Sequence, residues 1–135
     1  YELMSEGVST HERKPISSIA LNTDGSLLTI SSDDNGSNSI FSRQIQGLGS
    51  KGDILVGIST SGRSKNVIEA AKKAKELGLK VIILTGKPNS ELGKLADIEI
   101  CTPGGKFADR VQELHIKVIH ILIELVEREM FNQEY

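Results

Sequence analysis

The chain has 135 residues, of which 38% are hydrophobic and 25% charged. This size and composition predict one soluble domain with a single hydrophobic core. Its 16 Lys and Arg residues and 18 Asp and Glu residues leave a formal net charge of −2, so the broad positive field that nucleic-acid binding requires is missing. The single cysteine, Cys101, excludes an intramolecular disulfide framework and a CxxC metal site.

A location in the cytoplasm is the expectation from these features. The longest apolar stretch, residues 114–126, is interrupted by His115, Lys117, His120 and Glu124, so no membrane-spanning helix is predicted. Residues 1–6 lack the basic and apolar regions of a signal peptide. The chain begins without Met, and we expect it to be part of something longer.

The first third of the chain predicts short elements. Residues 16–21 are apolar and β-branched, and the turn residues 22–25 follow them, so a strand is expected there. Residues 27–30 form a second strand-like piece, and the polar residues 31–36 a loop. Residues 40–48 predict a short amphipathic helix that begins after Asn38 or Ser39.

From residue 53 onward, strand and helix patterns alternate. Apolar runs predict strands at residues 53–58, 80–84 and 97–101, and a helical apolar stripe spans residues 64–77. A short helix is expected at residues 91–95 and a long one at residues 107–130. Continuous apolar strands separated by helices are typical of an α/β fold with a doubly wound, mostly parallel sheet.

Ligands of such sheets bind beyond the carboxyl ends of the strands. One loop there, residues 57–64 with the sequence GISTSGRS, joins a buried strand to a helix. Four hydroxyls, from Ser59, Thr60, Ser61 and Ser64, and the unpaired N–H groups of the helix start predict a phosphate site. The alternative is an ordinary N-cap, which needs only one hydroxyl. The loop lacks the P-loop and dinucleotide-binding patterns, which favours a small phosphate ester.

The last predicted helix carries polar residues among aliphatic ones. On an ideal helix Gln112 and His120 point within ~80° of each other and lie ~12 Å apart along the axis, so they can line one cleft. His115 is turned to another side. For His120 the alternative is a core or interface histidine, and for Asp33 and Asp34, which follow a strand-like piece, it is a solvated turn.

Three segments together resemble the sugar isomerase (SIS) domain family, in its phosphoheptose isomerase branch. They are residues 52–87 with the STSGRS loop, the LADIEI segment at residues 95–100, and ADRVQELHIKVIHILIELVERE at residues 108–129. The resemblance extends over residues 16–131. It implies an aldose-ketose isomerase that converts sedoheptulose 7-phosphate to D-glycero-D-manno-heptose 7-phosphate, toward bacterial lipopolysaccharide.

Site residues follow from the resemblance position by position. It makes Ser59, Thr60, Ser61 and Ser64 the phosphate cradle. Asp33 and Asp34 match a substrate-binding Asn-Asp pair, with Asp in place of Asn at position 33. Gln112 and His120 match residues that line the active site and bind zinc. Glu2 matches a catalytic base and metal ligand, whereas a family arginine after it is missing unless Arg13 replaces it.

The resemblance also implies longer proteins, because N-terminal helices and a first central strand of the family have no counterpart here. We therefore expect residues 1–135 to form one SIS-type phosphosugar-binding domain without these elements. In the implied mechanism Glu2 moves a carbon-bound proton and His120 a proton on oxygen. A homotetramer is implied too, and the apolar circumference of the last helix favours association.

Two other functions stay open. A non-catalytic SIS module, as in the DnaA-initiator-associating proteins, would bind a phosphosugar or act as a scaffold. An isomerase of another sugar phosphate would share the phosphate loop and differ only in substrate.

Overall fold

The computed structural model describes residues 14–29 and 36–131. Glu2, Arg13, Asp33 and Asp34 lie outside the described residues. Two compact units are distinguished. The larger comprises residues 21–112, and the smaller contains the described residues 14–20 and 113–131. The larger unit holds the sheet and the predicted phosphate loop.

Three parallel strands form the sheet, in the order β1 (Ile54–Ser59), β2 (Lys80–Thr85) and β3 (Ile98–Cys101). All three were predicted from their apolar runs, with bounds that differ by one residue. The register places the last residues of the strands, Ser59, Thr85 and Cys101, side by side. The carboxyl edge of the sheet is therefore a row that begins with a serine of the predicted loop. The expected parallel α/β fold is confirmed.

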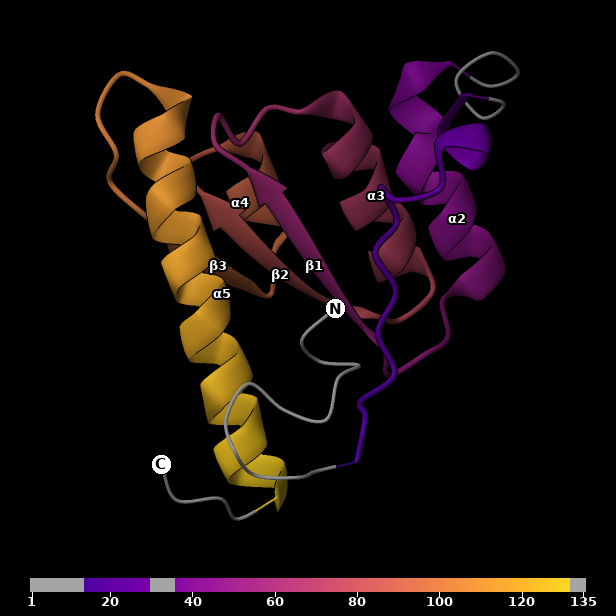
Figure 1. Cartoon of the computed structure of the whole chain (residues 1–135). Coiled ribbons are helices and arrows are strands. Elements are labelled where there is room, and N and C mark those ends of the chain that lie inside the picture. The colour runs from indigo at the N-terminus through magenta and orange to yellow at the C-terminus, as the bar shows by residue number, and fades with distance from the viewer. Residues whose placement is uncertain (1–13, 30–35, 132–135) are drawn as a thin grey trace. The chain divides into compact units, whose positions relative to one another are not determined.

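Helices cover one face of this sheet (Figure 1). α3 (Lys65–Glu76) contacts β1 and β2, α4 (Glu91–Leu95) contacts β2 and α3, and α2 (Ile40–Leu48) packs against α3. The short η2 (Ser37–Ser39) precedes α2, and α5 (Ala108–Phe131) closes the described chain. No helix among the described residues is long and apolar enough to cross a membrane.

The core of the larger unit lies between α3 and the sheet. α3 presents the small side chains of Ala70, Ala71 and Ala74, all buried, and the sheet presents Val81 and Ile83, which are fully buried. Alanine lets the helix backbone approach the strands closely while it keeps a high helix propensity. The period of 3.6 residues in the sequence predicts this stripe.

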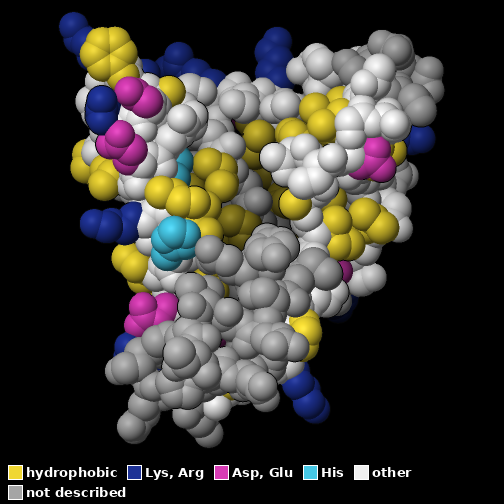
Figure 2. All heavy atoms as spheres, in the orientation of Figure 1, with side chains coloured by type: hydrophobic (Ala, Val, Ile, Leu, Met, Phe, Trp, Pro, Cys, Tyr) yellow, Lys and Arg dark blue, Asp and Glu magenta, His cyan; other side chains and the backbone are white. Residues whose placement is uncertain are grey.

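The opposite face of β1 is apolar and exposed. Ile54, Val56 and Ile58 are 60%, 50% and 44% exposed, and hydrophobic side chains gather over β1 in Figure 2. Within the described part of the chain β1 pairs with β2 alone. A strand of continuous apolar residues is typical of a parallel sheet that is covered on both faces, and here helices of the larger unit cover one.

The expected strand at residues 16–21 is wrong. The described residues 14–20 form no regular element, and a turn begins at Leu21. The carbonyl of Leu21 accepts a hydrogen bond from the Gln44 side chain on α2 rather than from a strand. Residues 25–29 are helical instead of extended, because Asp24 accepts from the backbone N–H of Leu27 and caps this turn.

Asp97 holds the start of β3. Its carboxylate accepts hydrogen bonds from the Lys75 ammonium of α3 and from the Val81 backbone N–H of β2, each at 2.8 Å. Both hydrogen bonds lower the pKa of Asp97, and the bond from Lys75 has the larger effect. This carboxylate lies at the amino end of the sheet, away from the row of Ser59, Thr85 and Cys101.

Candidate active site

The predicted phosphate loop connects β1 to α3. Ser59 is the last residue of β1, and Ser64 occupies the N-cap position of α3. Their hydroxyl oxygens are 2.7 Å apart and share one hydrogen bond. The Ser61 hydroxyl accepts from the backbone N–H of Arg63. The structure thus brings Ser59 and Ser64 together, with Thr60 and Ser61, both half-buried, on the turn between them.

Ser64 does not act as an ordinary cap. Its side chain accepts no hydrogen bond from the first turn of α3. The backbone N–H groups of Lys65 and Asn66 have no intrahelical acceptor, as at any helix start, and donate to no described residue. Two N–H donors and a hydroxyl are therefore left at the positive end of a 12-residue helix. This set of donors suits an anion.

Charge at the start of α3 also favours an anion. The first turn has no acidic residue, although Asp and Glu stabilise the positive end of a helix dipole. Arg63 and Lys65 stand there instead, and their side chains form no ion pair with any described residue. Basic residues cost the isolated helix up to about 1 kcal/mol each at this end. Their placement is useful to a bound phosphate.

Gly62 forms the apex of the loop. Its φ is +65°, and an added Cβ would lie 2.3 Å from Cβ of Ser90 and 2.4 Å from its Oγ. The Gly62 carbonyl accepts from the backbone N–H of Leu92 at 3.2 Å, and the Thr60 carbonyl accepts from that of Gly86 at 3.0 Å. The loop is therefore held from behind by the turn after β2 and the first turn of α4.

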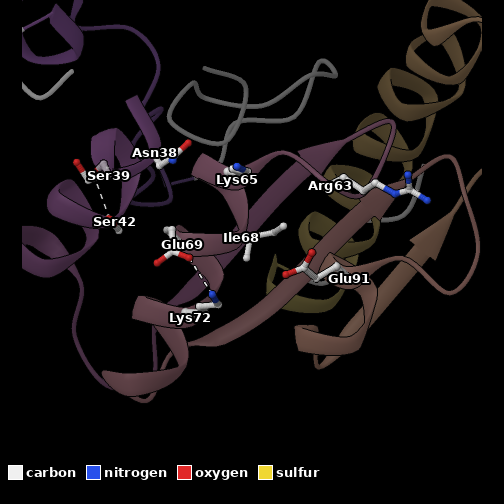
Figure 3. A pocket seen from close by; sticks show the side chains of 9 residues that line it. All are labelled: Asn38, Ser39, Ser42, Arg63, Lys65, Ile68, Glu69, Lys72 and Glu91. Atoms are coloured by element: carbon white, nitrogen blue, oxygen red, sulfur yellow. Dashed lines mark hydrogen bonds and ion pairs between the residues drawn. The ribbon is translucent and has the colours of Figure 1, made fainter. Parts of the chain in front are cut away.

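A cleft of about 640 Å³ opens beside the loop (Figure 3). Arg63, Lys65 and Glu91 line it together with the start of α2 and the exposed side of α3. Glu69 and Lys72 form an ion pair within it, and the Glu69 hydrogen bond raises the pKa of Lys72. Figure 3 shows the Arg63 side chain extending away from this pair. Arg63 and Lys65 are thus the cations available to a ligand.

A polar cluster behind the loop was not predicted from the sequence. Thr85 and Ser90 both donate hydrogen bonds to Oε1 of Glu99, at 2.7 and 3.3 Å. The signal for it was present, because a charged residue within the predicted apolar strand at residues 97–101 requires a partner. Without the register of β2 and β3, that partner could not be named.

Gln112 and His120 lie on α5, a continuous helix, as predicted. Both side chains are exposed, and a histidine is visible on the surface of α5 (cyan in Figure 2). His115, turned to another side, is only 2% exposed. Of these two histidines, His120 is exposed and His115 is buried.

The expected zinc ligands within the described residues are Gln112 and His120. No group of three or more His, Cys, Asp or Glu residues among them could hold a metal ion. Gln112 carries an oxygen donor and His120 a nitrogen donor, and both side chains are exposed on α5. These donors suit zinc, but two ligands are fewer than the three or four that zinc takes from a protein.

Several known proteins are similar to this chain. The sequence profile of the SIS domain matches residues 2–86. The phosphoheptose isomerase of Histophilus somni is 56% identical over 108 residues, 80% of this chain and 55% of that protein. That of Escherichia fergusonii is 54% identical, over 80% of this chain and 56% of that protein. The chain spans just over half the length of these curated relatives.

Solved structures agree with the sequence matches. Phosphoheptose isomerase GmhA from Neisseria gonorrhoeae superimposes with a TM-score of 0.77 at 42% identity, covering 80% of this chain and 61% of that chain. A phosphoheptose isomerase from Francisella tularensis gives a TM-score of 0.86 at 33% identity, covering 94% and 66%. The profile match extends over more than half of the chain, and the fold is that of these enzymes. The chain therefore belongs to the SIS-domain family.

Proposed function

We propose that this chain belongs to an aldose-ketose isomerase that converts sedoheptulose 7-phosphate to D-glycero-D-manno-heptose 7-phosphate for lipopolysaccharide precursors. The observation that carries the proposal is the start of α3, where the Ser64 hydroxyl pairs with Ser59 instead of capping the helix. Two backbone N–H groups and two basic side chains are left there for a phosphate. The names of the relatives, phosphoheptose isomerase, support the choice of sugar.

The loop fixes one end of the substrate. The backbone N–H groups of Lys65 and Asn66 and the hydroxyls of the STSGRS loop bind the 7-phosphate, and Arg63 adds a positive charge. A phosphate held this way places C1 and C2 of the sugar at a constant distance from the loop. Binding energy from the phosphate is then available to orient the reacting carbons.

The reaction moves two protons. From the ketose, a base removes a proton from C1 and returns one to C2, and the hydroxyl proton passes from O1 to O2 through a cis-enediol. Glu2 is the proposed base at carbon. His120 is the proposed acid and base at oxygen, since a histidine imidazole can both donate and accept a proton. Asp33, Asp34 and Gln112 are proposed to bind the sugar hydroxyls.

Zinc is the proposed cofactor, with His120, Gln112 and Glu2 as ligands. When bound, it would act as a Lewis acid on the sugar carbonyl. The proposal rests on the mixed nitrogen and oxygen donors and on the exposure of Gln112 and His120.

Removal of zinc is expected to abolish turnover of sedoheptulose 7-phosphate while phosphate binding at the loop persists. The loop donors are backbone N–H groups and hydroxyls, which need no metal. The measurement is turnover of the purified protein before chelation, after chelation and after zinc is restored, with calorimetry of inorganic phosphate binding in each state. Unchanged turnover after complete chelation, verified by metal analysis, would contradict the zinc assignment.

The substitution Ser64→Ala is expected to weaken inorganic phosphate binding by about tenfold or more, because a hydrogen bond to a charged group contributes about 1.5–3 kcal/mol. The melting temperature should fall only modestly, since this hydroxyl caps no N–H group and the change removes its hydrogen bond to Ser59. Ser50→Ala, in the exposed turn before β1, is the matched control and should bind phosphate normally. A large loss of stability with unchanged phosphate affinity would show that Ser64 serves the helix and not a ligand.

We also propose a cytoplasmic homotetramer that associates through α5. Exposed apolar side chains on α5 include Leu114, Ile121 and Leu125, and with Val118 they follow spacings of four, three and four residues. This is the spacing of a helix-packing seam. Light scattering of the purified protein distinguishes the tetramer from a monomer, which would overturn the proposal.

The function is tested by offering the protein sedoheptulose 7-phosphate, unphosphorylated sedoheptulose and a panel of other ketose phosphates. We expect conversion of sedoheptulose 7-phosphate with the highest kcat/KM. Preference for another member of the panel would change the substrate. Binding without conversion of any member would instead indicate a phosphosugar-binding module.

A further inference from the structure

Glu99 is a carboxylate within an otherwise apolar strand. Its neighbours on β3, Ile98 and Ile100, point to the opposite face of the sheet, and Glu99 lies half-buried on the face covered by α3 and α4. Burial of a carboxylate is costly unless donors surround it. Here the two donors come from β2 and from the start of α4, and each donor residue is a neighbour of the phosphate loop.

The first donor is Thr85, the last residue of β2, which is fully buried. Its hydroxyl donates to Oε1 of Glu99 at 2.7 Å, and its position in the register is next to Ser59 of the loop. The second donor is Ser90, at the start of α4, whose hydroxyl donates to the same oxygen at 3.3 Å. One carboxylate oxygen thus joins β2, β3 and α4.

Glu99 also determines which way the Ser90 hydroxyl points. A hydroxyl has one proton and two lone pairs. Because Ser90 gives its proton to Glu99, its lone pairs accept the backbone N–H of Gly93 at 3.0 Å, which caps α4. An added Cβ on Gly93 would lie 2.4 Å from the Glu99 carboxyl atoms. The carboxylate is therefore confined by α4 as well as bonded to it.

Ser90 in turn limits the position of the loop. Gly62 packs so closely on the Ser90 side chain that a Cβ would overlap it, and the Gly62 carbonyl accepts from Leu92. The loop apex therefore rests on the first turn of α4, at a side chain held by Glu99. A shift of Ser90 would displace Gly62 and, with it, the Ser61 and Ser64 hydroxyls and the start of α3.

We propose that Glu99 is a positioning residue for phosphate binding. Its carboxylate fixes the Ser90 side chain, and Gly62 of the phosphate loop packs directly on that side chain. The proposal rests on the proposed function of that loop. Glu99 itself touches no ligand and acts through Ser90. A substrate that is anchored by its phosphate depends on the packing of Gly62 on Ser90, because this contact sets the position of the loop.

The test compares Glu99→Leu with Glu99→Gln. Leucine removes the acceptor, so we expect the folded variant to bind inorganic phosphate about tenfold more weakly, a loss typical of one misplaced charge-assisted hydrogen bond. Glutamine keeps an acceptor oxygen for both hydroxyls, so binding within about twofold of the parent is expected. In a turnover assay of the parent substrate, KM should rise in Glu99→Leu more than kcat falls.

Asp97→Asn is the matched control. The Asp97 carboxylate, just before β3, also accepts two hydrogen bonds, from Lys75 of α3 and Val81 of β2, but at the amino end of the sheet. It should lower the melting temperature and leave phosphate affinity unchanged. If Glu99→Leu behaves like this control, the role of Glu99 is merely structural and the proposal is overturned. If Glu99→Leu does not fold, Ser90→Ala carries the test, with the same loss of phosphate affinity expected and unchanged affinity overturning it.

Phosphate binding by the unsubstituted protein is measured first, by calorimetry. Its absence would refute the phosphate loop itself and with it the proposed function. Binding by the unsubstituted protein and by Glu99→Leu alike would refute only the role of Glu99. The two failures are therefore distinguishable.

Discussion

The substitution His120→Ala is expected to lower kcat for sedoheptulose 7-phosphate by about 10²–10⁴-fold, the usual contribution of a general acid or base. Inorganic phosphate should bind as before, because the loop donors come from β1 and α3. The exposed position of His120 predicts that the substitution leaves the fold intact. Turnover and calorimetric phosphate binding, measured on the same preparation, check both expectations.

Lys117→Ala is the matched control for that variant. Lys117 is exposed on α5 within one turn of His120, and its loss should leave kcat within about twofold, since exposed substitutions away from a site change little. Full turnover by His120→Ala would contradict the proton-transfer role of His120. An equal loss in both variants would assign the effect to the surface of α5 instead.

The substitution Gly62→Ala is expected to damage both the phosphate site and the stability of the fold. The φ of +65° disfavours a side chain by about 1–2 kcal/mol, and the new methyl group would overlap Ser90. Relief of that overlap costs a further ~1–3 kcal/mol and moves the loop. We expect phosphate affinity to fall by at least about tenfold and the free energy of unfolding by about 2–5 kcal/mol.

Gly52→Ala separates the backbone penalty of a positive φ from the steric overlap with Ser90. Gly52 has a φ of +96° and nothing within 4 Å of an added Cβ, so it carries the backbone penalty without the overlap. It lies before β1, at the amino end of the sheet. We expect a loss of about 1–2 kcal/mol in denaturant unfolding and normal phosphate binding. Equal phosphate affinity in Gly62→Ala and the parent would contradict the seating of the loop on Ser90.

Local patterns were sufficient for most of the fold. The apolar runs of β1, β2 and β3 and the stripe of Ala70, Ala71 and Ala74 each carry a period that a short window of sequence reveals. Glycines and capping residues then set the ends within a residue or two. The parallel arrangement followed because continuous apolar strands alternate with helices.

The strand expected at residues 16–21 shows where such patterns fail. A strand exists only through its neighbour, and a β-branched run does not reveal whether a partner is present. In the structure the Leu21 carbonyl bonds to Gln44, 23 residues away, and Asp24 starts a helical turn. Neither contact can be predicted from local composition.

The candidate site also has a part that local sequence patterns predict and a part that they do not. The STSGRS loop was predictable because its residues are contiguous and stand between a strand and a helix. The cluster of Thr85, Ser90 and Glu99 was not, since its members lie on three elements and meet only through the register of β2 with β3. The roles proposed for Glu2, Asp33 and Asp34 come from family resemblance, and these residues lie outside the described part of the chain.

The most direct test of the account follows the carbon-bound protons of sedoheptulose 7-phosphate by NMR in D₂O, with and without the protein. Proton transfer through an enediol predicts that the aldose heptose 7-phosphate appears only with the protein, and that its C2 carries deuterium from solvent. If the sugar phosphate binds, yet neither the aldose nor deuterium at carbon appears, the isomerase assignment is contradicted.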